Sequence, residues 1–113
     1  MTKQANVITT ASATAQELYR RLLTTLDSIG PFEVEPKKTS VHLVRRSAFA
    51  GVQFRRECII LTIKSEKPIK SERVIAADQP SANRWHSEIR ITTGGDIDRQ
   101  LLGWLKAAFD LCA

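Results

Sequence analysis

The chain has 113 residues, a length that accommodates one domain and leaves no room for a second. Apolar residues make up 42% and charged residues 26%, an ordinary globular composition that excludes collagen, low-complexity arrays and disulfide-stapled miniproteins. The longest uninterrupted aliphatic stretch, Cys58 to Leu61, is far shorter than the ~18 apolar residues of a membrane span, and residues 1–14 contain no apolar signal-peptide core. We therefore expect a cytoplasmic protein that does not enter a membrane.

The formal charge of +5 is unevenly distributed. Ten of the 17 basic residues lie between residues 36 and 73 beside only three acidic ones, so this segment carries +7 and the remainder −2. A basic segment is typical of surfaces that bind phosphates or other anions, but a solvated sheet face and loop would look the same. The two cysteines, Cys58 and Cys112, form no C-x-x-C motif and are expected to be reduced, buried thiols.

The first element predicted is a helix over Thr14 to Ile29. Thr14 and Glu17 have capping-box spacing, leucines recur at helical spacing, and Gly30-Pro31 is a stop signal. Residues 1–12 are expected to be a flexible N-terminus, and residues 13–113 a single α+β domain.

Alternating apolar residues then predict three strands, at Thr39 to Arg45, Phe49 to Arg55 and Cys58 to Lys64. Their short connections predict an antiparallel meander, and the Ile59-Ile60-Leu61 run indicates that the third strand is central. Residues 65–84 contain two prolines and are predicted to form a long loop. A fourth strand, His86 to Thr92, and a second helix, Asp96 to Leu111 with Asp96 or Asp98 as its cap, complete the chain.

The predicted order is therefore α-β-β-β-β-α. It indicates an α+β two-layer sandwich, with a four-stranded antiparallel sheet and two helices on one face. Side chains alternate along a strand, so the strand pattern also predicts which residues face the helices. The inward set is Val41, Leu43, Ala50, Val52, Phe54, Ile59, Leu61, Ile63, Ile89 and Ile91. The outward set is His42, Val44, Gly51, Gln53, Arg55, Ile60, Thr62, Lys64, His86, Glu88 and Arg90.

Both histidines of the chain fall on the predicted open face, together with Glu88 and several cations. This combination indicates an anion or ligand site, or acid–base chemistry with His86, His42 and Glu88 as candidate catalytic residues; simple cross-strand pairing would explain the same pattern. Candidate ligand-binding residues are Lys37, Lys38, Arg45, Arg46, Arg55, Arg56, Lys64 and Arg90. No metal-ligand spacing, P-loop or dinucleotide fingerprint occurs, so neither a metal nor a cofactor is expected.

Three segments carry a resemblance to a known family: Glu35-Pro36-Lys37-Lys38-Thr39, Phe49-Ala50-Gly51-Val52, and the C-terminal part with His86, Ile89-Arg90-Ile91, Asp96-Ile97-Asp98 and Leu101 to Phe109. Together they resemble a bacterial family of small domains known as domain of unknown function 5655, over Ala15 to Cys112. Relatives often have Tyr where this chain has Phe109. The resemblance implies a compact α+β domain without an established activity, and it adds His86 and Glu35 to Lys38 as candidate site positions.

The function that the sequence favours is a binding module that recognises an anionic partner or ligand through a basic sheet face and loop. A nucleic acid is one such partner, although the outward set contains no aromatic residue on which RNA bases could stack. One alternative is a small enzyme or ligand sensor that uses His86, His42 and Glu88. The other is a homodimer that forms through the sheet face, with Val44 and Ile60 as apolar contacts.

Overall fold

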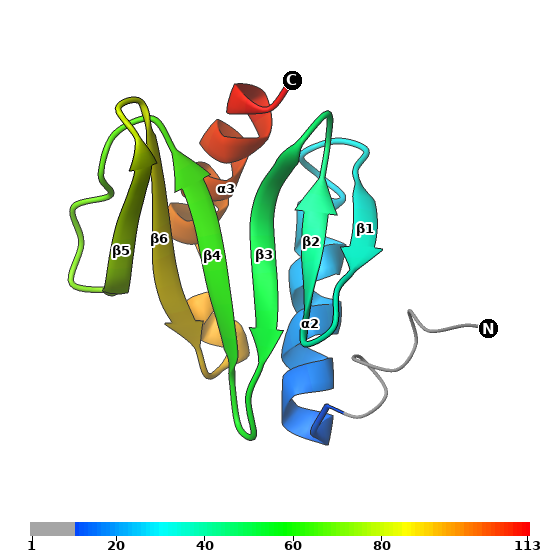
Figure 1. Cartoon of the computed structure of the whole chain (residues 1–113). Coiled ribbons are helices and arrows are strands. Elements are labelled where there is room, and N and C mark those ends of the chain that lie inside the picture. Colours follow the sequence, from blue (N-terminus) through cyan, green and yellow to red (C-terminus); the bar gives the residue numbers. More distant parts are fainter. Residues whose placement is uncertain (1–10) are drawn as a thin grey trace.

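The computed structural model describes residues 11–113 and places two helices against one face of an antiparallel sheet (Figure 1). The elements in chain order are α2 (Ala13–Leu26), β1 (Glu33–Pro36), β2 (Ser40–Val44), β3 (Ala48–Phe54), β4 (Ile59–Ser65), β5 (Val74–Ser81), β6 (Arg84–Ile91), a 3-10 turn (Gly94–Asp96) and α3 (Arg99–Leu111). The strand order across the sheet is β1-β2-β3-β4-β6-β5. Residues 1–10, most of the predicted flexible terminus, lie outside the described residues.

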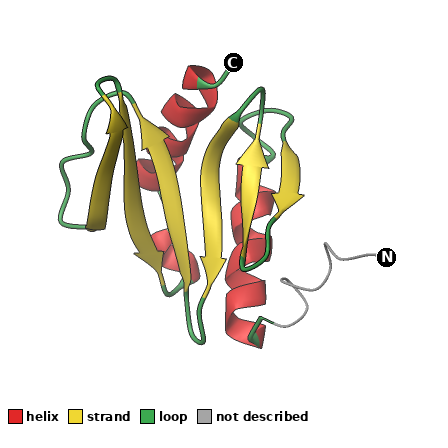
Figure 2. Ribbon diagram, viewed as in Figure 1, coloured by secondary structure: helices red, strands yellow, loops and turns green. Residues whose placement is uncertain are grey.

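The predicted α+β class is confirmed, and both helices lie behind the sheet while its other face is uncovered (Figure 2). The β2-β3-β4 meander and the interior position of β4 are also as expected. The predicted number of four strands is wrong, because the sheet has six. The two additional strands are the edges, β1 and β5, and β5 lies within the segment that was expected to be a loop.

The first helix begins and ends earlier than predicted. Its N-cap is Ser12, whose hydroxyl accepts from the backbone N–H of Ala15 at 3.1 Å, so Thr14 lies inside the helix and does not cap it. The helix ends at Leu26, three residues before the predicted end. Gly30 has φ of 153°, and a Cβ there would approach the Phe109 ring to 2.9 Å, so both its backbone conformation and its packing require glycine.

Two acidic residues precede the second helix, and only one of them caps it. Asp98 is the N-cap of α3, accepting from the N–H of Leu101 at 3.0 Å. Asp96, the other predicted cap, lies in the 3-10 turn, where Oδ2 accepts from the N–H groups of Thr92 and Thr93 at 2.9 and 3.2 Å. These bonds, led by the one from Thr92, hold the pKa of Asp96 below its ordinary value. The predicted start of α3 at Asp96 is therefore three residues too early.

The core lies between the sheet and the helices and contains the predicted inward residues. All of them are buried except Phe54, which is half-buried and packs edge-to-face on Tyr19 with ring centroids 5.2 Å apart. Phe49 belongs to the core although simple alternation does not place it there. A register shift between Leu43 and Val44 leaves Phe49 as an extra residue of β3, and its ring packs 5.3 Å from that of Phe109.

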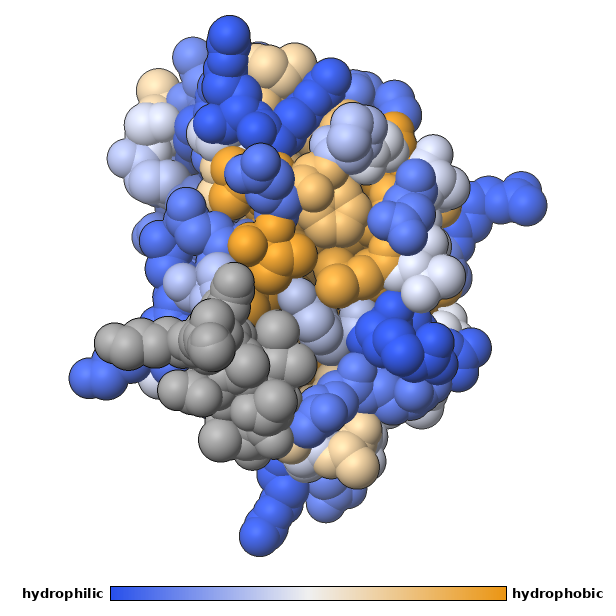
Figure 3. Space-filling model, turned by 90° about the vertical axis from the view of Figure 1, so that its right-hand side faces the viewer, coloured by the Kyte–Doolittle hydropathy of each residue, from blue (hydrophilic) through white to orange (hydrophobic). Residues whose placement is uncertain are grey.

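On the side that carries β1 and α2, apolar side chains gather at the centre and hydrophilic ones surround them (Figure 3). Leu23 of α2 and Val34 of β1 are partly buried and pack against the core. Phe32, just before β1, meets Phe49 edge-to-face with centroids 6.0 Å apart. The helix and the edge strand therefore close the core on this side. No helix within residues 11–113 is both long and apolar enough to cross a membrane.

Candidate functional site

The open face of the sheet contains a groove of about 220 Å³ whose floor is the backbone of β3. Polar side chains from four neighbouring strands line it: Ser40 and His42 from β2, Gln53 from β3, Thr62 and Lys64 from β4, and His86 from β6. Ala48, Phe49, Ala50, Gly51 and Val52 complete the lining. Gly51 lies in the middle of the groove, opposite His42. Because glycine has no side chain, nothing projects from β3 into the groove at this position.

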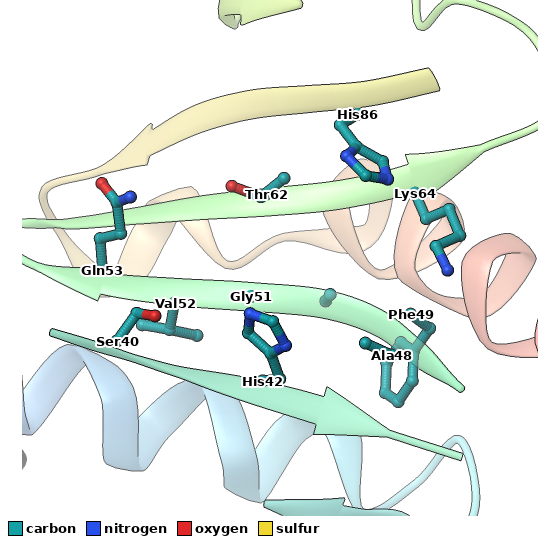
Figure 4. Close-up of a pocket in the computed structure, with 11 residues that line it drawn as sticks. Ser40, His42, Ala48, Phe49, Gly51, Val52, Gln53, Thr62, Lys64 and His86 are labelled. Carbon is teal, nitrogen blue, oxygen red and sulfur yellow. The ribbon is translucent and has the colours of Figure 1, made fainter. Parts of the chain in front are cut away.

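The two histidines lie on opposite walls of this groove and lean toward it (Figure 4). His42 projects over Gly51, where an added Cβ would lie 3.6 Å from His42 Cδ2. His86 is the cross-strand partner of Lys64. Since three strand spacings of about 4.8 Å separate β2 from β6, their backbones lie about 14 Å apart. The two histidines therefore line the same groove. The distance between their backbones means that they would act together only through a ligand that contacts both.

Glu88, the third candidate for catalysis, lies beside the groove and does not line it. It is the cross-strand partner of Thr62, and the corresponding partner of His86 on the edge strand is Asp78. Within residues 11–113, no three His, Cys, Asp or Glu side chains are arranged so that they could hold a metal ion. The groove can therefore provide hydrogen bonds and positive charge from its own side chains.

Most of the candidate basic residues lie outside the groove. Lys37 pairs with Glu35 at 2.7 Å, a contact that holds the pKa of Glu35 below its ordinary value with a smaller contribution from His42. Arg45 stacks on the Phe109 ring at 4.0 Å and donates to the Phe109 carbonyl at 3.0 Å, so its guanidinium is engaged with the end of α3. Arg45 therefore stabilises the contact between the β2–β3 turn and α3 and does not line the groove.

The other cations are divided between two ends of the sheet. Arg46 lies in the turn between β2 and β3, whereas Arg55 and Arg56 follow β3, and the seven residues of β3 span about 23 Å between them. Lys38 is in the β1–β2 turn, at the same end as Arg55, because Ser40 pairs with Gln53. Arg90 is exposed on the open face, in register with Ile60. Of the eight candidates, the structure places only Lys64 in the groove.

Three residues that were not predicted as site residues line the groove: Ser40, Gln53 and Thr62. Alternation did place Gln53 and Thr62 on the open face. What identifies them is the strand register, which sets Ser40 beside Gln53 and Thr62 beside Gly51. Such a register can be proposed from sequence only where a short turn fixes it.

A family model described as Domain of unknown function (DUF5655) matches residues 4–112, so the chain belongs to this family, and the resemblance found in the sequence is confirmed. Comparisons with curated proteins and with solved structures found no match to the chain.

Proposed function

We propose that this member of the DUF5655 family is a binding module that holds a small anion in the open-face groove, with Lys64 and His86 as its main contacts. The observation that carries the proposal is the composition of the lining. Its eleven residues include one lysine and two histidines and no carboxylate. A lysine ammonium donates three hydrogen bonds and accepts none, so it is suited to an anion.

The position of Lys64 supports this role. None of the ion pairs formed within residues 11–113 involves Lys64, whereas Lys37, Arg45 and Arg73 each have a carboxylate partner. Lys64 is half-buried against β3 and β6, so an anion beside it would be less screened by solvent than at an exposed lysine. His86, directly opposite, can add a second donor, or two when protonated.

Three carboxylates outside the groove moderate its charge. Glu35 lies opposite His42 on β1, Asp78 lies opposite His86 on β5, and Glu88 lies opposite Thr62 on β6. Each would repel a bound anion and attract a protonated imidazole, so they favour a ligand of limited charge over an extended polyanion. The division of the remaining cations between the two ends of the sheet points the same way.

A catalytic role and a homodimer remain predictions with less support. Glu88 lies opposite Thr62 and outside the groove, and the carboxylates opposite the two histidines, Glu35 and Asp78, also lie outside its lining. Ile60, one of the two apolar contacts expected for a dimer, is only 3% exposed. The cytoplasmic location likewise stays a prediction from the sequence.

The proposal is tested by titrating the protein with inorganic phosphate and following the two imidazoles and the Lys64 amide by NMR. We expect shifts at His86 and Lys64 that saturate, and at least a tenfold loss of affinity in Lys64→Gln, because a charge-assisted contact is worth more than about 1.4 kcal/mol. Lys38→Gln, in the exposed β1–β2 turn, is the matched control and should bind phosphate as the wild type does. Equal affinities in the two variants would contradict the proposed site.

Asp78→Asn offers a second test of opposite sign. Removing this carboxylate takes away a repulsion next to His86, so phosphate should bind about two- to fivefold more tightly at low salt, and the gain should shrink as salt is added. The same measurement with Asp27→Asn, beyond the end of α2, controls for net charge. Weaker binding in Asp78→Asn would mean that the anion is not held near His86.

A further inference from the structure

The two ends of the groove differ in chemistry, and this difference points to the class of ligand. We infer that the ligand is a phosphorylated sugar or polyol, with its phosphate at Lys64 and His86 and its hydroxyl groups toward Ser40 and Gln53. The inference rests on the proposed function, because it places the anion at the same two residues. It goes beyond it by assigning the neutral half of the groove to a hydroxylated tail.

The length of the groove supports a ligand with two parts. Lys64 and His86 form one cross-strand row, and Ser40 and Gln53 form another in register with Ile60. Four residues of β4 separate these rows, which at about 3.3 Å per residue is about 13 Å. An inorganic phosphate contacts one row only, whereas a ligand that uses both must extend along β3 and β4.

Side chains at the second row match hydroxyl groups. Ser40 has a hydroxyl, which both donates and accepts, and Gln53 has an amide with the same double capacity. Thr62, beside Gly51 in the row between the two ends, adds a second hydroxyl. The Oε1 atom of Gln53 accepts from Arg55 Nη2 at 2.9 Å, which orients the amide and leaves Nε2 to donate to a ligand oxygen. Arg55, whose guanidinium is held on Gln53, and Arg90, in register with Ile60, are close to this end, but neither lines the groove, so the lining itself offers neutral polar groups to ligand oxygens.

The size and the lining of the groove favour a small ligand without a flat aromatic ring. A volume of about 220 Å³ is below the ~300 Å³ at which drug-sized sites begin. Phe49 is the only aromatic ring apart from the imidazoles in the lining, and it is 1% exposed and packed between Phe32 and Phe109. A nucleobase would therefore find no ring on which to stack.

The test compares glucose 6-phosphate, inorganic phosphate and glucose by calorimetry on the whole chain. We expect glucose 6-phosphate to bind at least tenfold more tightly than phosphate, and glucose alone to bind more weakly than either. Gln53→Leu should remove the advantage of the sugar phosphate and leave the affinity for phosphate unchanged. Lys64→Gln should weaken both ligands. Gln79→Leu, on the exposed edge strand, is the control for loss of an amide, and Ser40→Ala is the second variant should Gln53→Leu fail to fold.

The outcomes separate the two proposals. Phosphate that binds at Lys64 as tightly as glucose 6-phosphate would overturn the sugar-phosphate inference and leave the anion site intact. Equal losses of both ligands in Gln53→Leu would also overturn it, because the neutral row would then act on the phosphate itself. Absence of binding by phosphate and glucose 6-phosphate alike would count against both.

Discussion

The two faces of the sheet are built from the same strands, yet their side chains are held in different ways. On the helix side, aliphatic residues such as Leu61 and Ile63 are fully buried under α2 and α3. On the open side, Thr62 and Lys64 alternate with them along β4 and remain half-buried and polar. Neighbouring residues of one strand therefore differ in burial, and substitutions on the two faces should differ in their effect on stability.

The cations show the same contrast. Arg73, just before β5, reaches the residues that precede α3, donating to Asp98 Oδ1 at 3.0 Å and to the Asp96 carbonyl at 2.6 Å. Its guanidinium carbon lies 5.8 Å from the centroid of the Trp104 ring. Lys64 and Arg90 on the open face take part in none of the ion pairs within residues 11–113. Arg73 thus fastens one element to another, whereas no ion pair within the described residues ties Lys64 or Arg90 to a neighbouring element.

The largest expected effect comes from a charge on the buried face. Leu61→Asp places a carboxylate at a fully buried position without a partner, which costs several kcal/mol, of the order of the ~5–15 kcal/mol that keep a domain folded. We expect a chain that does not unfold cooperatively, measured by circular dichroism during thermal and urea denaturation. Thr62→Asn, one residue along and on the open face, should lose no more than about 1 kcal/mol. Similar melting of the two variants would show that the faces are not distinct.

A smaller effect is expected from the arginine that fastens β5 to α3. Arg73→Ala removes the hydrogen bonds to Asp98, Gln100 and the Asp96 carbonyl from a side chain that is 23% exposed, and should lower the free energy of unfolding by about 1–2 kcal/mol. Arg90→Ala, at an exposed arginine of the open face, should change it by less than about 0.5 kcal/mol. Urea denaturation measures both, and equal losses would remove the contrast between the two sets of cations.

The interior of the sheet could be predicted from sequence and its edges could not. Strands β2, β3, β4 and β6 each bury one face under the helices, so apolar residues recur at every second position. β5 is exposed along nearly its whole length and includes Asp78 and Pro80. Its place in the sheet depends on backbone pairing with β6, since few of its side chains are buried. β1 has only four residues, two of them glutamates. An edge strand of this kind leaves no hydrophobic period to detect.

The candidate site was predictable in part for the same reason. Alternation alone places His42, His86 and Lys64 on the open face. It does not show that β6 lies next to β4, since a long connection separates the two strands in the chain, and the shared groove depends on that neighbourhood. Phe49 was not predicted to be in the core because a β-bulge breaks the alternation at that point.

Acid should weaken the fold on the helix side through Asp96. Because the folded state holds the pKa of Asp96 below its ordinary value of about 3.9, the unfolded chain takes up a proton first as the pH falls. The stabilisation is therefore complete above that value and is lost as the pH drops through the folded-state pKa. Asp96→Asn should cost about 1 kcal/mol at neutral pH and less in acid. Urea denaturation between pH 2 and 7 measures this, with Glu57→Gln in the exposed β3–β4 turn as the control. A constant difference between Asp96→Asn and wild type across that range would contradict it.

The smallest expected effect is a gain in stability at the one polar side chain that is buried on the helix side of β6. Ser87 is 0% exposed, between Ile63 on β4 and Ala77 on β5, and its hydroxyl makes no hydrogen bond within residues 11–113. A buried hydroxyl without a partner loses its bonds to water on folding, so Ser87→Ala should leave the free energy of unfolding unchanged or raise it by about 0.5–1 kcal/mol. Ser47→Ala, in the exposed β2–β3 turn, is the matched control for loss of a hydroxyl and should be neutral. A loss of more than about 1 kcal/mol in Ser87→Ala, measured by urea denaturation, would mean that the hydroxyl is hydrogen-bonded in solution. It would also mean that the helix side of the sheet is less purely apolar than the contrast between the two faces requires.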